Sequence, residues 1–286
     1  MKNPIRSFIK SFIKQRYGTI IPANISILGT NELLRNRKAL VTGGGNGIGK
    51  AIVEEFLKAG CDVVFTSRNE EKAKHCEEEF RKIYPNRKIL GIKMDIRQVD
   101  SFQYIFNIIV TQFGSIDILV NNAGVGEGWW CHTSVEEFDN VIETNLRGPF
   151  FLTEIVARYM RDNNIKGNIL NICSSAGLRP ANTAYRLSKW SMRAFTLGLA
   201  KTLIPYDIVV NGIAPGPTAT AMMARQDNSN LSKPGSPSGR MATPQEIANM
   251  AVIYVSNMSR TIVGDICYMA GGSGLLTVDD TNIYTF

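Results

Sequence analysis

The sequence has few histidines, no paired cysteines and no long apolar run. Its two histidines, His75 and His132, lie far apart, which argues against a metal site or a catalytic triad built on histidine. The five cysteines show no C-x-x-C spacing, so neither a disulfide framework nor a zinc site is expected. No stretch approaches the roughly 20 apolar residues of a membrane-spanning helix. These absences indicate a cytoplasmic protein with reduced thiols and no metal.

Acidic residues are also missing from the first 31 positions. Five of the 32 basic residues precede the first acid, Glu32, and without them 27 basic residues face 25 acidic ones. The net charge of +7 is therefore mostly a property of an N-terminal arm, residues 1–36. A nucleic-acid-binding domain, which carries a basic face within its fold, is not expected.

The arm has the pattern of an amphipathic helix. Apolar side chains recur at helical spacing, at Ile5, Phe8, Ile9, Phe12 and Ile13. Three roles stay open. The arm could dock on its own or a neighbouring subunit, contact an anionic membrane surface peripherally, or act as a cleaved organelle presequence.

Residues 37–286 are predicted to form one α/β domain. Near-continuous apolar runs predict strands at residues 38–42, 62–67, 89–95, 116–121, 167–173, 207–213 and 262–269. Strands that are apolar on both faces are typical of a parallel sheet covered by helices. Helices are expected between them, including residues 48–59, 98–113 and 185–203, and a capping box at Ser134 and Glu137 predicts the start of another. We expect a doubly wound, seven-stranded parallel sheet of the Rossmann type.

Three polar residues suggest chemistry. Tyr185 and Lys189 are four positions apart, so on a helix they share one face. A cation beside a phenol favours the phenolate, which suits a general acid/base. Ser174 lies eleven positions before Tyr185. Cys173 has no base near it in sequence and is interpreted as a buried strand thiol.

These residues and several motifs resemble the classical short-chain dehydrogenases/reductases, from about residue 37 to about residue 274. The motifs are T-G-G-G-N-G-I-G at 42–49, N-N-A-G at 121–124, E-T-N-L-R-G at 143–148, C-S-S-A-G at 173–177, Y-R-L-S-K at 185–189, P-G at 215–216 and R-M-A-T-P at 240–244. The resemblance implies that Tyr185 is the acid/base and that Ser174, preferred over Ser175, holds the substrate oxygen. Lys189 would assist Tyr185 and bind the nicotinamide ribose, and Asn145 would hold a water that connects Lys189 to solvent.

The glycine-rich motif predicts a pyrophosphate site. A strand followed by a glycine turn and a helix directs backbone N–H groups and a helix N-terminus toward an anion. The spacing is T-G-x-x-x-G-x-G, and the contacts expected there are Gly43, Gly45, Asn46, Gly47, Ile48 and Gly49. By resemblance, the remaining contacts are Asp95 and Ile96 at the adenine, Asn122, Ala123 and Gly124 along the nucleoside, and Tyr185, Lys189, Pro215, Gly216, Thr218 and Thr220 toward the nicotinamide.

The end of the second predicted strand bears on the choice of cofactor. An acid there would bind the ribose hydroxyls of NAD and repel the 2′-phosphate of NADP. This chain has Ser67 and Arg68 instead, which suit a phosphate. NADP(H) is therefore favoured over NAD(H), and Glu70 and Glu71 are placed in the first turn of the next helix.

The substrate is left open, within the class of small-molecule carbonyls and alcohols. A carbonyl reductase, or the reverse alcohol dehydrogenase, is the leading hypothesis. A 3-oxoacyl-acyl-carrier-protein reductase, a sugar or steroid dehydrogenase and a non-catalytic dinucleotide sensor are the alternatives. Arg147, Arg161 and Arg186 could meet an acidic carrier. Trp129 and Trp130 could stack on a substrate, and Met222, Met223 and Met241 flank a breaker-rich loop at 219–240 that could close over it.

A homo-oligomer is expected, a tetramer in preference to a dimer. By resemblance, the helices near residues 150–161 and 185–203 would pair across two-fold axes. Their apolar residues include Phe151, Val156, Met192 and Phe195, which offer more apolar surface than one core needs.

Overall fold

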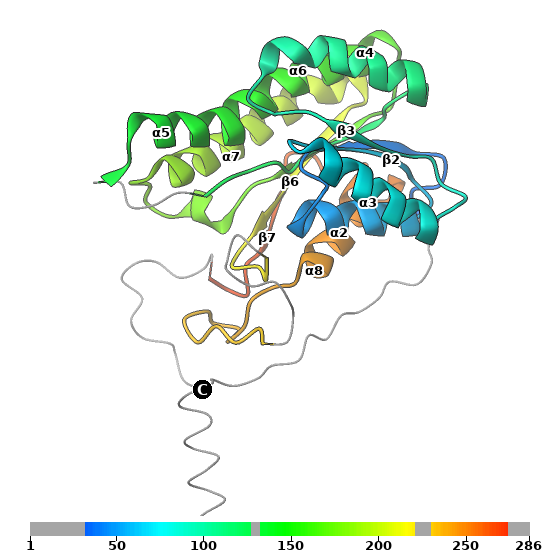
Figure 1. The fold of residues 1–286 in the computed structure, drawn as a ribbon. Helices are drawn as coiled ribbons and strands as arrows, with labels where there is room; N and C mark the ends of the chain where they lie inside the picture. The colour runs from blue at the N-terminus through cyan, green and yellow to red at the C-terminus, as the bar shows by residue number, and fades with distance from the viewer. Residues whose placement is uncertain (1–31, 127–131, 221–229, 274–286) are drawn as a thin grey trace, which may run out of the picture.

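The centre of the molecule is a seven-stranded sheet with the order β3-β2-β1-β4-β5-β6-β7, and all neighbouring strands are parallel. The computed structural model describes residues 32–126, 132–220 and 230–273 (Figure 1). The strands are β1 (Lys38–Val41), β2 (Asp62–Ser67), β3 (Ile89–Lys93), β4 (Ile118–Asn121), β5 (Asn168–Ile172), β6 (Val209–Pro215) and β7 (Ile266–Met269). The fold is therefore the expected doubly wound sheet.

Helices cover both faces of this sheet (Figure 1). One face carries α2 (Gly47–Lys58), α3 (Glu70–Ile83) and α8 (Pro244–Val255). The other carries α4 (Phe102–Phe113), α6 (Gly148–Asp162) and α7 (Ala184–Leu203). A shorter helix, α5 (Val135–Ile142), begins at Ser134 with the predicted capping box to Glu137. It continues into α6 through a π-helical turn, η3 (Glu143–Arg147).

Each face has its own apolar core. Between the sheet and α2, α3 and α8 lie fully buried side chains such as Phe56, Phe65 and Ile247. On the opposite face, Phe102, Ile109 and Val156 fill the space beneath α4, α6 and α7. Because both sheet faces are covered, the strands are apolar nearly throughout, as the sequence pattern predicted.

Some predictions need correction. The last strand is shorter than the expected 262–269, because Gly264 adopts a positive φ of 75° and breaks the extended chain. The helix expected at 98–113 starts as a 3-10 turn, η1 (Val99–Ser101), before α4. Val156 and Met192 were expected at a subunit interface, but both are buried in the core of the chain itself.

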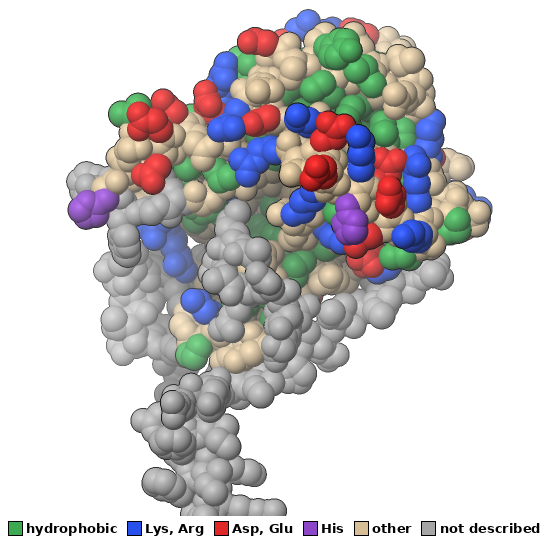
Figure 2. All heavy atoms as spheres, viewed as in Figure 1, with side chains coloured by type: hydrophobic (Ala, Val, Ile, Leu, Met, Phe, Trp, Pro, Cys, Tyr) green, Lys and Arg blue, Asp and Glu red, His purple; other side chains and the backbone are tan. Residues whose placement is uncertain are grey.

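Several expected features lie outside the described residues. They are the arm up to residue 31, Trp129, Trp130, Met222 and Met223. Among the helices that are described, none has the length and apolar character needed to span a membrane. Figure 2 shows acidic and basic side chains intermingled over α3, where Lys74 pairs with Glu70 and Arg81 with Glu77.

Candidate active site

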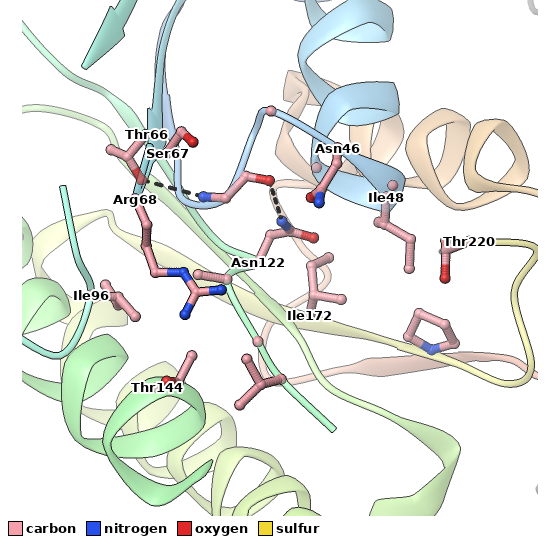
Figure 3. Close-up of a pocket in the computed structure, with 18 of the residues that line it drawn as sticks. Asn46, Ile48, Thr66, Ser67, Arg68, Ile96, Asn122, Thr144, Ile172 and Thr220 are labelled. Carbon is pink, nitrogen blue, oxygen red and sulfur yellow. Dashed lines mark hydrogen bonds between the residues drawn. The ribbon is translucent and has the colours of Figure 1, made fainter. Parts of the chain in front are cut away.

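A cavity of about 400 Å³ lies at the carboxyl ends of β1, β2, β4, β5 and β6 (Figure 3). From β1 the chain builds the sheet in one direction through β2 and β3, and it then crosses back to place β4 on the other side of β1. The cavity therefore lies at the switch point where open α/β sheets bind ligands. The predicted site residues in its wall are Gly43, Gly45, Asn46, Gly47, Ile48, Gly49, Ser67, Arg68, Ile96, Asn122, Ala123, Gly124, Ser174, Tyr185, Lys189, Pro215, Gly216, Thr218 and Thr220. Asp95 and Asn145 lie outside the wall.

The glycine turn after β1 is held by its neighbours. The Gly43 N–H donates to Thr66 Oγ1 at 3.3 Å, and the Asn122 amide donates to the Gly43 carbonyl at 3.3 Å (Figure 3). A side chain at Gly49 would place its Cβ only 2.3 Å from that carbonyl, so this position requires glycine. The turn thus presents backbone amides and the start of α2 to the cavity.

The N-terminus of α2 has no internal partner for its first amides. Asn46 is the N-cap but its side chain makes no capping hydrogen bond, and the first turn of α2 contains no acid. The unbonded amides and the helix dipole make this end of α2 suited to an anion.

The end of β2 places two cations beside the glycine turn. Figure 3 shows Arg68 extending from β2 into the cavity beside Ile96. Lys72, in the first turn of α3, also lines the wall, and its Cε lies 3.6 Å from where a Gly45 Cβ would be. Neither Arg68 nor Lys72 forms an ion pair with a described residue, whereas nearby Lys50 pairs with Glu79 at 2.7 Å. Two unpaired cations at a cavity edge favour an anionic ligand.

The sequence prediction missed Lys72. A signal was available, because Lys72 follows Arg68 by four positions and lies one turn into the helix after β2. Asn69 fixes this turn by accepting a hydrogen bond from the Lys72 N–H at 2.8 Å. Glu70 and Glu71 occupy the first turn of α3, as predicted.

Asp95, expected at the adenine, pairs with a neighbouring arginine. Its carboxylate accepts hydrogen bonds from Arg97, at 3.1 Å from Nε and 2.7 Å from Nη2. The Arg97 guanidinium lowers the pKa of Asp95 through these bonds, against the effect of burial. The neighbouring side chain Ile96 forms that part of the wall together with Thr144.

Tyr185 and Lys189 project from the first two turns of α7. The Lys189 Nζ lies 5.9 Å from the centre of the Tyr185 ring. Lys189 is only 7% exposed, and its Nζ donates to the carbonyl of Ile172, the last residue of β5, at 2.9 Å. A buried ammonium without an acidic partner among the described residues is costly, which marks Lys189 as a candidate functional group.

The loop after β5 brings a hydroxyl to the same cavity. Ser174 lines the wall and its Oγ accepts from the Ala176 N–H at 3.1 Å, while Ser175 is buried away from it. Cys173 also lines the wall. Burial raises the pKa of its thiol, and its Sγ lies 3.8 Å from Thr196 Oγ1, so it is suited to packing and not to attack.

Asn145 lies directly behind the wall, on the π-helical turn η3. Its Oδ1 accepts from the Val125 N–H at 2.8 Å, and its Nδ2 donates to the Val125 carbonyl at 2.9 Å. Gly124 separates it from Lys189, since a Cβ at Gly124 would lie 3.3 Å from Asn145 Oδ1 and 3.8 Å from Lys189 Nζ. No pattern in the sequence indicated the π-helical turn that sets this position.

The far end of the cavity is formed after β6. A Cβ on Gly216 would lie 2.8 Å from the Ala270 Cα, so the chain after β7 packs tightly on this turn. Thr218 Oγ1 donates to the Gly216 carbonyl at 3.0 Å. No group of three or more histidines, cysteines or acids suited to a metal ion occurs in the part of the chain that is described.

Comparisons with known proteins agree with this architecture. The family model described as short chain dehydrogenase matches residues 37–230. The chain is 31% identical over 247 residues to a 3alpha-hydroxysteroid dehydrogenase of Mediterraneibacter gnavus, covering 84% of this chain and 98% of the relative. It is 35% identical over 247 residues to the 3-oxoacyl-(acyl-carrier-protein) reductase FabG of Chlamydia muridarum, covering 85% and 99%.

A solved structure agrees as well. The 3-ketoacyl-(acyl-carrier-protein) reductase from Brucella melitensis, complexed with NADH, superposes with a TM-score of 0.76 at 27% identity, covering 84% of this chain and 99% of the other. The family match, the relatives and the solved structure therefore all agree with the fold described above. The chain belongs to the classical short-chain dehydrogenase/reductase family of oxidoreductases, which act on alcohol and carbonyl groups.

Proposed function

We propose that this protein interconverts a carbonyl compound and a secondary alcohol with NADP(H), using Ser174, Tyr185, Lys189 and Asn145. The observation that carries the proposal is the delivery of Tyr185 and Lys189, from one helix, into the cavity that Ser174 also lines. A phenol, an ammonium and a hydroxyl at one wall are the groups needed where charge develops on a substrate oxygen.

The chain's own residues would manage the proton and the oxygen. The bound cofactor supplies or accepts the hydride. In reduction, Tyr185 donates its phenolic proton to the carbonyl oxygen while Ser174 donates a hydrogen bond to the same atom. The Lys189 ammonium stabilises the phenolate that is left, and it is held in place by the Ile172 carbonyl.

The residues present fit a dinucleotide with a 2′-phosphate. The glycine turn and the free amides of α2 suit the pyrophosphate, and Gly49 cannot carry a side chain without a backbone clash. Arg68 and Lys72, which form no ion pair with a described residue, suit the phosphate on the ribose. An acid in the place of Ser67 would oppose it, and none is there. NADP(H) is therefore the proposed cofactor.

Replacing the proposed acid tests this function directly. Tyr185→Phe removes the phenolic proton and should lower NADPH-dependent reduction about 10²–10⁴-fold, because a general acid contributes that much. NADPH binding, followed by calorimetry, should change little. Tyr104→Phe, at an exposed position of α4, is the control. If Tyr185→Phe retained more than about a tenth of the activity, Tyr185 would not be the acid.

A panel of substrates defines the compound reduced. Ketones, 3-oxoacyl thioesters, sugars and steroids should each be offered with NADPH. A 3-oxoacyl-acyl-carrier-protein reductase is the second candidate, because several of the similar proteins are named as acyl-carrier-protein reductases. Two of the three arginines considered for an acidic carrier are already paired, Arg147 with Glu143 at 3.6 Å and Arg161 with Asp162 at 2.8 Å. These pairs weaken the carrier hypothesis.

We also propose a homo-oligomer, a tetramer or a dimer. The outer faces of α6 and α7 expose large apolar side chains, namely Phe150, Phe151, Leu187, Trp190 and Leu197. Phe150 stacks on Phe195 with ring centres 5.2 Å apart, so aromatic side chains of α6 and α7 lie side by side. Light scattering should show more than one subunit at micromolar concentration, and a monomer would contradict the proposal.

A further inference from the structure

Ser188 is a completely buried hydroxyl between two of the proposed catalytic residues. It lies in α7, three positions after Tyr185 and one before Lys189, with an exposed fraction of 0%. Its Oγ donates to the Tyr185 carbonyl at 2.7 Å and accepts from the Asn145 Nδ2 at 3.1 Å. The Ser188 hydroxyl therefore donates one hydrogen bond within its own helix and accepts another from Asn145.

The partner Asn145 is hydrogen bonded at both ends of its side-chain amide. Its Oδ1 accepts from the Val125 N–H at 2.8 Å, and its Nδ2 donates to the Val125 carbonyl at 2.9 Å as well as to Ser188. Through Asn145 and Ser188, three separate segments meet: the loop after β4, the π-helical turn η3 and the first turn of α7. Buried polar groups joined in this way fix relative position, because losing one contact leaves another group unsatisfied.

We propose that Ser188 is a positioning residue for the reaction, which sets the place of Tyr185 relative to Asn145 and to the wall at Val125. This inference rests on the proposed function, in which Tyr185 is the acid. A serine hydroxyl inside a helix commonly donates to a carbonyl one turn earlier, and such a bond stays within the helix. Ser188 differs because a side chain from another element donates to it. That second bond ties the turn carrying Tyr185 to the rest of the site.

The same helix supplies a matched control. Ser191 donates to the Leu187 carbonyl at 3.0 Å, a similar bond one helical turn earlier. It is not fully buried, and among the described residues no hydrogen bond joins its side chain to another element. Ser188→Ala and Ser191→Ala therefore remove comparable intrahelical bonds, and only the first removes the link to Asn145.

The test combines a readout of the link with a readout of the reaction. In full-length protein, Ser188→Ala should speed hydrogen exchange of the Val125 amide, which Asn145 protects, and Ser191→Ala should not. With the best carbonyl compound of the panel, Ser188→Ala should lower kcat about tenfold to a hundredfold, because small misplacements of a reacting group have effects of this size. The dissociation constant of NADPH should stay within about twofold of the original value.

A double variant separates positioning from general destabilisation. If Ser188 acts through Asn145, adding Ser188→Ala to Asn145→Ala should lower kcat little further, whereas independent effects would multiply. Ser188→Cys, which keeps the volume but weakens both hydrogen bonds, replaces the alanine variant if that one fails to fold. The inference is overturned if Ser188→Ala and Ser191→Ala give the same hydrogen exchange and the same kcat. It is also overturned if the effects of Ser188→Ala and Asn145→Ala on kcat multiply in the double variant. An active Tyr185→Phe would instead contradict the proposed function, while the exchange result would still report on the link.

Discussion

The two ends of the cavity differ in how exposed their charged residues are and in how these residues are paired. At the end of β2, Arg68 and Lys72 form no ion pair with a described residue, and Arg68 is exposed. At the end of β5, Lys189 and Asn145 are buried and hydrogen bonded. The first end is suited to attract a charged group from water, and the second to hold reacting groups in fixed positions before a substrate arrives.

This difference has energetic consequences. An exposed cation interacts weakly through water, so changing it should alter ligand choice with little effect on folding. A buried, bonded group cannot be removed without leaving its partners unsatisfied. Substitutions at the β5 end should therefore reduce the rate strongly, while substitutions at the β2 end should exchange one cofactor for another.

The largest effect is expected at Lys189. Lys189→Ala removes the ammonium beside Tyr185 and should lower kcat about 10²–10⁴-fold, since the acid/base then lacks its cation. NADPH should also bind more weakly. Lys201→Ala, at an exposed position in the last turn of α7, is the control. Equal rates for the two variants would mean that Lys189 is a structural residue.

A smaller effect, on cofactor choice, is expected at the β2 end. Arg68→Asp should lower the kcat/KM ratio of NADPH to NADH by roughly tenfold to a hundredfold, the value of one or two charge-assisted hydrogen bonds. Lys72→Ala should lower it in the same direction but less, because only one of the two cations is lost. Lys74→Ala, whose ammonium is already paired with Glu70, is the control. If neither Arg68→Asp nor Lys72→Ala changed the kcat/KM ratio of NADPH to NADH, the 2′-phosphate would not bind at this end of the cavity.

Between the two ends, Gly49 tests the backbone of the glycine turn. Gly49→Ala would force a Cβ to within 2.3 Å of the Gly43 carbonyl and 2.4 Å of Asn122 Nδ2. Overpacking of this kind should lower the melting temperature by roughly 2–12 °C. At Gly45 the nearest atoms to an added Cβ are 3.6 Å away or more, so Gly45→Ala should melt with the original protein. Equal melting temperatures for Gly49→Ala and Gly45→Ala would show that the backbone of the glycine turn can shift to accommodate a methyl group.

The smallest effect is expected from salt. Raising ionic strength should increase the KM for NADPH more than the KM for NADH, because the exposed Arg68 is screened by ions. The buried β5 end should keep its kcat over the same range. Steady-state rates with both cofactors at several concentrations of sodium chloride measure this difference. Parallel changes in the two KM values would speak against a phosphate contact at Arg68.

The sequence predicted the parts of the molecule that depend on local pattern. The alternation of apolar runs and amphipathic stretches gave seven strands in the right places, and the capping box at Ser134 gave the start of α5. Ser174, Tyr185 and Lys189 were chosen from spacing, and the fold brings all three to one cavity. Helical periodicity and short motifs are encoded locally, so they can be recognised without a structure.

Features that depend on distant pairing could not be predicted. Whether a cation is free depends on every acid near it in space, so Lys72 looked like any other lysine of a charged helix. Nothing in the sequence says that Arg97 folds back on Asp95, so this pair was not foreseen, and the contact of Asp95 with the adenine stays a prediction. Likewise, the apolar Val156 could face a partner or its own sheet, and only the packing of α6 decides.

The π-helical turn η3 changes the direction in which side chains point along one continuous helical segment. Residues 135–162 run without a break through α5, η3 and α6. The turn at 143–147 is wider than an α-helical turn and accommodates one extra residue. A regular α-helix would rotate everything beyond it by about 100°. With the inserted residue, Asn145 faces Val125 while Leu152, Val156 and Met160 still face the sheet. One continuous helical segment therefore orients the proposed site residue Asn145 and the core residues at two independent angles. Loss of a single residue there would force the chain to give up one of these orientations.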